Sequence, residues 1–81
     1  MELILVEPSG KKEELEANYV HALTTQGDVG IFENHTASML ILKEGPIEFT
    51  KKDNTKEVRQ LRGGLLICDP KSVKILADHI N

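Results

Sequence analysis

The sequence predicts an all-β domain of short strands, either a sandwich or a barrel. Val, Ile and Thr supply 17 of the 81 residues, whereas alanine occurs four times. These branched side chains favour pleated sheet over helix. Turn signals rich in Gly, Pro, Asn and Asp separate the short apolar runs. A chain of this length holds one small core, so we expect a single domain over residues 1–81.

The expected strands follow from the spacing of apolar residues between these turns. Ile47 and Phe49 alternate with polar neighbours and should point into the core. After the next turn, Val58 and Leu61 are also expected to point inward. The strands are placed at 2–7, 12–23 (with a break near Leu15 left open), 28–32, 37–43, 46–51, 55–61, 64–68 and 72–77.

Three runs are apolar at every position: Leu3–Val6, Met39–Leu42 and Leu65–Ile67. Strands of this kind are covered on both faces, so a second sheet or a partner chain should cover each run. By contrast, Lys11–Ala17 is the best helical candidate but carries crowded glutamates. We interpret it as a charged hairpin arm.

Composition excludes several classes of function. Thirteen acidic and ten basic residues give a net charge of −3, which argues against nucleic-acid binding. No apolar run approaches the roughly 20 residues of a membrane span, and the acidic N-terminus is unlike a signal peptide. The single cysteine, Cys68, cannot form an intrachain disulfide, and a reducing compartment such as a bacterial cytoplasm fits best.

Histidine and cysteine offer few candidates for chemistry. His21, His35 and His79 lie on different segments without zinc-ligand spacing, so no metal site is expected. Cys68 with His35 could form a nucleophile and base, but Cys68 ends an apolar strand and is better explained as a core residue. Ser38 with His35 lacks an oxyanion-hole motif.

Glycines mark the other notable positions. Gly63-Gly64 precedes a strand rather than a helix, which indicates a bend near another backbone and not a phosphate loop. Gly27 can supply the positive φ of a turn, and Gly30 indicates close packing against its strand. Asp28 projects from that turn, either as a solvated tip or as an acidic contact for a partner.

Several segments together resemble the epsilon subunit of F-type ATP synthase, and the match covers essentially the whole chain. Each segment alone is weak evidence for this family, but the order and spacing of the segments together are fairly specific to it. The matching segments are Thr25–Ile31 with its Gly-Asp-Val-Gly-Ile core, His35, Gly45, Gly63-Gly64-Leu65 and Val73–Asp78.

The resemblance implies a central-stalk rotor subunit that joins gamma to the membrane rotor ring, performs no chemistry and binds no cofactor or metal. It implies a flattened two-sheet β-sandwich of roughly eight to ten short strands, and a peripheral location on the cytoplasmic face of the bacterial inner membrane. Carried over by position, the rotor-ring contact comprises Gly27, Asp28, Val29, Gly30 and Ile31. The gamma contact comprises His35, Met39 and Leu40.

Two departures from the family pattern stand out. Glu33-Asn34 replaces the usual Pro-Gly before the histidine, and Asn34 should preserve the turn because asparagine tolerates a left-handed backbone. The 81 residues also stop before the two-helix hairpin of most members. We therefore expect no ATP site and no helical brake in this chain.

Two other classes remain open. Biotinyl and lipoyl carrier domains have a similar size and are all-β, but Lys51-Lys52-Asp53 lacks their motif around a lone lysine. A small enzyme would need a cleft with paired titratable groups near His35 or Cys68.

Overall fold

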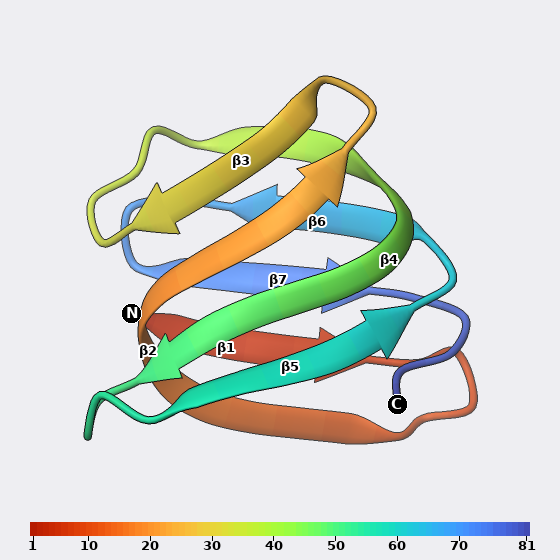
Figure 1. Ribbon diagram of the computed structural model, residues 1–81, viewed down its shortest axis with the longest axis horizontal. Helices are drawn as coiled ribbons and strands as arrows, with labels where there is room; N and C mark the ends of the chain where they lie inside the picture. Colours follow the sequence, from red (N-terminus) through yellow and green to blue (C-terminus); the bar gives the residue numbers. More distant parts are fainter.

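The computed structural model describes all 81 residues and contains seven strands and no helix (Figure 1). The chain accordingly has no helix that could cross a membrane. The all-β expectation is confirmed. The strands are β1 (Glu2–Val6), β2 (Lys12–Thr24), β3 (Gly27–Phe32), β4 (Ser38–Lys51), β5 (Lys56–Leu61), β6 (Gly64–Cys68) and β7 (Ser72–Leu76).

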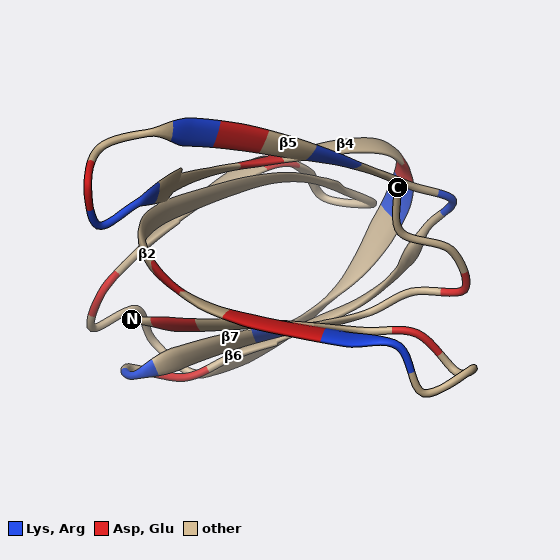
Figure 2. Ribbon diagram, turned by 90° about the horizontal axis from the view of Figure 1, so that it is seen from below, with Lys and Arg blue, Asp and Glu red and all other residues tan.

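Two long strands, β2 and β4, belong to both layers of the sandwich (Figure 2). The first half of β2 pairs with β1, and its second half pairs with β3 and β4. The first half of β4 pairs with β6, and its second half pairs with β2 and β5. The first sheet therefore has the order β2-β1-β7-β6-β4, and the second sheet has the order β3-β2-β4-β5.

The structure corrects the expected separation of strands 37–43 and 46–51, since β4 runs through Gly45 and Pro46 without interruption. Gly45 adopts a φ of 150° at the bend where β4 passes from one sheet to the other. This positive φ is strained for any residue with a Cβ and favours glycine at the bend, and the Leu23 side chain lies 2.9 Å from where that Cβ would stand. β2 runs through Leu15 without the break left open there, and its pairing with β4 shifts register further along the strand, between Ala17 and Tyr19.

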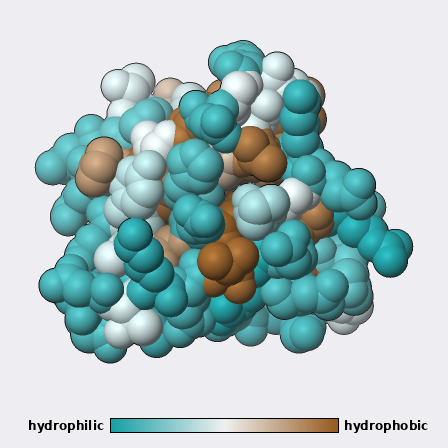
Figure 3. Space-filling view, in the orientation of Figure 1, coloured by the Kyte–Doolittle hydropathy of each residue, from teal (hydrophilic) through white to brown (hydrophobic).

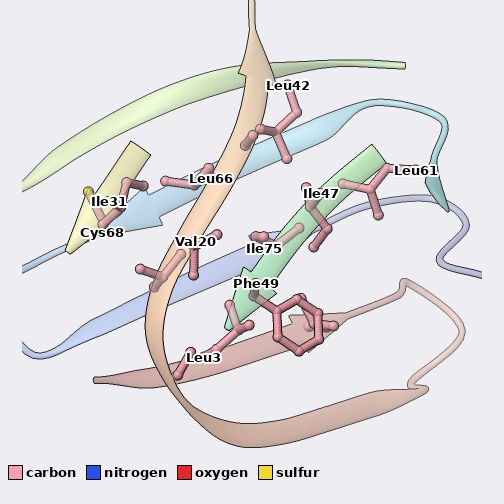
Figure 4. Close-up of a cluster of buried hydrophobic side chains, with 14 of the residues drawn as sticks. Leu3, Val20, Ile31, Leu42, Ile47, Phe49, Leu61, Leu66, Cys68 and Ile75 are labelled. Carbon is pink, nitrogen blue, oxygen red and sulfur yellow. The ribbon is translucent and has the colours of Figure 1, made fainter. Parts of the chain in front are cut away.

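Apolar side chains from both sheets meet between the layers (Figure 4). Ile47 and Phe49 are each 1% exposed and Leu61 is 3% exposed, which confirms their inward direction. Lys11–Ala17 forms the charged arm that opens β2 rather than a helix. The expected inward direction of Val58 is wrong, because Val58 pairs with exposed Glu48 on the outer face and is 48% exposed.

Charged side chains occupy the inward positions of β5 instead. Arg59 packs over the ring of Phe49 at 5.3 Å and places its Nη2 atom 3.0 Å from Glu13 and 2.8 Å from Glu57. Glu13 belongs to the arm of β2 in the first sheet, so Arg59 bridges the two layers at their open side. Lys51 also contacts Glu57, at 2.8 Å.

Candidate functional site

The predicted acidic turn is the hairpin between β2 and β3. Gly27 has a φ of 108°, which confirms its expected role. The hydroxyl of Thr24 donates to the carbonyl of Gly27 at 2.9 Å and accepts from the N–H of Gln26 at 3.0 Å. The Asp28 carboxylate is 67% exposed and lies 3.7 Å from Nε2 of His21. The turn is therefore held in one shape and presents its carboxylate to solvent.

The five predicted rotor-ring residues divide between the surface and the core. Gly27, Asp28 and Gly30 are exposed, whereas Val29 packs against the core and Ile31 is fully buried. Hence Asp28 and the neighbouring backbone are what a partner at this edge could touch.

Gly30 has the close neighbour that the sequence indicated. The hydroxyl of Tyr19 lies 2.5 Å from where its Cβ would be. The Tyr19 ring also packs against Phe32, with ring centroids 4.6 Å apart. Together these contacts pack the Tyr19 side chain across β3 on the outer face of the second sheet.

His35 lies in the loop between β3 and β4 and is half-buried. Asn34, just before it, has a φ of 68°, so the left-handed backbone expected there is present. The carboxylate of Glu33 lies 4.0 Å from the amino group of Met1. Nδ1 of His35 contacts the carbonyl oxygen of Thr36 at 2.8 Å, and this hydrogen bond requires a proton on Nδ1 because the carbonyl can only accept.

The fold brings His35, Ser38 and Cys68 together. Sγ of Cys68 lies 3.4 Å from Nδ1 of His35 and 3.1 Å from Oγ of Ser38. Cys68 is 3% exposed, and none of the three surface hollows of the molecule reaches it. This geometry supports a core thiol that anchors the loop, and it provides no substrate cleft. No three His, Cys, Asp or Glu side chains lie close enough to hold a metal ion.

Met39 and Leu40, predicted gamma contacts with His35, point to opposite sides of β4. Met39 is 64% exposed on the outer face of the first sheet, whereas Leu40 packs against the core. His35 sits beside Cys68 rather than on that outer face. Of the three, Met39 is the residue that a partner could cover most directly.

The outer face of the first sheet carries a largely apolar surface that the site prediction largely missed. Pairing places Met39 beside Ile67 and Ile41 beside Leu65, and it continues the same rows across β7 and β1. Met39 and Ile41 are 64% and 59% exposed, so no sheet of this chain covers them. The unbroken apolar runs in the sequence were the signal that could have indicated this surface. We call this surface the apolar face; it comprises Ile4, Val6, Met39, Ile41, Leu65, Ile67 and Leu76.

A hollow of about 320 Å³ opens beside the apolar face, between Val6, Leu76 and Gly64. Gly64 keeps this region compact, because a Cβ there would collide with the carbonyl oxygen of Leu76 and lie 3.0 Å from Cα of Ala77. The predicted close approach of another backbone at the double glycine is thus confirmed.

The two outer faces differ in character. Figure 3 shows the second sheet from outside, mostly hydrophilic with isolated brown patches. Acidic residues line the edge of the first sheet along β2, where Figure 2 shows them in red. Near the hairpin considered for a carrier, the Lys51 ammonium is held by Glu57, whose hydrogen bond and charge raise the pKa of Lys51.

Comparison with known proteins agrees with this architecture. The family model described as "ATP synthase, Delta/Epsilon chain, beta-sandwich domain" matches residues 1–81. An ATP synthase epsilon chain of Teredinibacter turnerae is 39% identical over 57 residues, which cover 70% of this chain and 40% of that protein. The chain thus spans less than half the length of this relative.

Two solved structures share the fold. A chain of the Euglena gracilis mitochondrial ATP synthase, in a structure of OSCP, F1 and the c-ring, superposes with a TM-score of 0.83 at 20% identity over 98% of this chain and 51% of that one. A chain of the Tetrahymena thermophila central stalk and c-ring gives 0.80 at 19% identity, over 100% and 65%. The resemblance seen in the sequence is confirmed: the chain belongs to the β-sandwich domain family of ATP synthase delta and epsilon chains.

Proposed function

We propose that this domain is a non-catalytic adaptor in the central stalk of an F-type ATP synthase. It binds gamma through its first sheet and meets the membrane rotor ring through the Asp28 turn. It thereby supports the coupling of ion flow to ATP synthesis. Its place would be peripheral, on the cytoplasmic face of a bacterial inner membrane.

The observation that carries this proposal is the exposed apolar face. Solvent-exposed side chains such as Met39 and Ile41 in one contiguous surface are typical of a protein interface. Family membership and the stalk assemblies that contain the two similar structures make gamma the partner that this face fits best. A lasting contact of this kind buries about 1,000 Å² or more.

The Asp28 turn has a different character, which supports a different partner. It is polar, it is rigidly hydrogen-bonded, and it projects a carboxylate. Exposed ion pairs contribute only about 0–1 kcal/mol each, so this edge would form a wet contact that sets orientation more than affinity. Polar loops of a rotor ring would suit it.

Co-purification from the native membrane tests the proposal. A tagged copy of the full-length native chain should bring gamma and the ring with it after detergent extraction. Recovery of the chain free of both, or mass spectrometry that reveals a covalent biotinyl or lipoyl group on Lys51 or Lys52, would contradict the adaptor role.

A further inference from the structure

Lys74 occupies an unusual place in the outer surface of the first sheet. It stands on β7, the middle strand of that sheet, and pairing puts it between Ile67 of β6 and Ile4 of β1. Leu76 follows two residues later on the same face. An exposed cation thus interrupts the centre of the apolar face.

No carboxylate of this chain neutralises Lys74. The nearest acidic residues on the same face are Glu2 on β1 and Glu14 on β2, which pairing places beside Ser72 and Ile4. Glu14 instead pairs with Lys12 at 3.5 Å, and none of the ion pairs of the molecule includes Lys74. The ammonium is therefore available to a partner.

A partner that covers the apolar face must also cover this lysine, because the lysine lies in the middle of it. An ammonium taken out of water without a counter-charge is strongly unfavourable, whereas a matched carboxylate offsets much of that cost. We propose that Lys74 is the specificity-determining residue of this face, and that the gamma surface it binds is apolar with one Asp or Glu opposite Lys74. This inference rests on the proposed function, because it names the chemistry of the same interface.

The acidic edge along β2 strengthens the argument. Across the sheet, the outer face runs from apolar β4 and β6, through Lys74, to apolar β1 and then to Glu14 and Glu16. Charges at unequal positions across an apolar surface fit a partner in one orientation and penalise the reversed one. A rotor adaptor needs such a fixed orientation.

The test measures affinity for the gamma subunit of the same synthase by calorimetry, with the chain and two variants. Lys74→Met keeps the apolar stem and removes the charge; it should weaken binding by about tenfold or more, because the partner carboxylate is left unpaired. Lys74→Glu should weaken it by about a hundredfold or more. Matched controls are Lys56→Met and Lys56→Glu on the outer face of β5, which should bind as the wild type does.

The outcomes distinguish the inference about Lys74 from the proposed adaptor role. Wild-type binding together with unchanged or tighter binding of Lys74→Met would overturn the inference and leave the adaptor role standing. Failure of the wild type to bind gamma would overturn the adaptor role and this inference with it. A gamma variant with one acidic residue changed to Lys should restore the binding of Lys74→Glu, and failure of every such single change would also overturn the inference. Unchanged melting temperatures of the variants verify that the exposed substitution leaves the fold intact.

Discussion

Individual residues decide where the chain can turn and what it presents. Gly27 and Asn34 both adopt positive φ, and both positions could be anticipated because these residue types tolerate that backbone. Gly30 and Gly64 were recognisable as sites of close packing, although their neighbours Tyr19 and Leu76 were not. A glycine within a strand indicates that another group packs closely against it, and only the folded structure shows which group that is.

At Gly64 we expect substitution to destabilise the domain. Gly64→Ala must place a Cβ against the backbone of Leu76 and Ala77 at a φ of 149°. The free energy of unfolding in urea should fall by about 2 kcal/mol or more. Gly10→Ala is the matched control, since Gly10 also has a positive φ but no atom within 4 Å of the new Cβ. Equal losses in the two variants would contradict the role of close approach.

Asp28 should contribute modestly to ring attachment. In the assembled synthase, Asp28→Ala should weaken coupling by about fivefold or less, because a single exposed charge contributes little. Asp28→Lys should have a larger effect through repulsion of a cationic or amide-rich loop. Proton pumping in membrane vesicles measures the coupling of each variant, with Lys52→Glu in the β4–β5 hairpin as a charge-reversal control. Wild-type coupling in both Asp28 variants would count against the contact.

At the scale of elements, β5 shows most clearly why sequence patterns fall short. Its alternation suggested Val58 as the inward residue, yet Glu57 and Arg59 face the interior. Charged side chains are tolerated there because the sandwich is open at this edge, where Arg59 reaches Glu13 from the other sheet. That partner is 46 positions away in the chain, and no local pattern reveals it.

The Arg59 bridge should make stability depend on pH. Hydrogen bonds and charge from Lys51 and Arg59 hold the pKa of Glu57 below its ordinary value. The stabilisation is present above about pH 4.3, the ordinary pKa of an unfolded glutamate, and is lost as the pH falls through the lower folded value. Arg59→Met should reduce stability at pH 7 by about 1 kcal/mol after allowance for solvent screening.

The same variant should lose less stability on acidification than the wild type does. Urea unfolding at pH 7 and pH 3 measures both effects, and Lys56→Met on the opposite side of β5 is the control. Parallel losses on acidification in wild type and Arg59→Met would show that the bridge is not the acid-sensitive element.

For the whole molecule, fold class, strand order along the chain and family could be predicted because they depend on local pattern. The apolar face could not be predicted as a surface, since it arises from pairing among β4, β6, β7 and β1. The sequence showed apolar runs and left open whether a sheet or a partner covers them. The fold shows that the chain covers one side of each run and leaves Met39 and Ile41 exposed.

The two faces therefore make opposite predictions for similar substitutions. Ile41→Asp on the apolar face should reduce gamma affinity by about tenfold or more and leave the melting temperature unchanged, because Ile41 is 59% exposed. Val58→Asp, on the other face and 48% exposed, should leave the affinity unchanged, although the new carboxylate faces Glu48 across the strand pair and should lower the melting temperature slightly. Calorimetric titration with gamma checks this pair. Equal loss of affinity in both variants would mean that the first sheet is not the docking side.

The sharing of β2 and β4 between the layers has a mechanical consequence. In a sandwich whose layers touch through side chains alone, a sideways load can make one sheet slide over the other. Here two continuous backbones cross from layer to layer, so sliding would require stretching of covalent chain or breaking of strand pairs at the bends near Ala17 and Gly45. A twisting force applied to one layer is therefore transmitted to the other layer with little relative displacement of the two sheets.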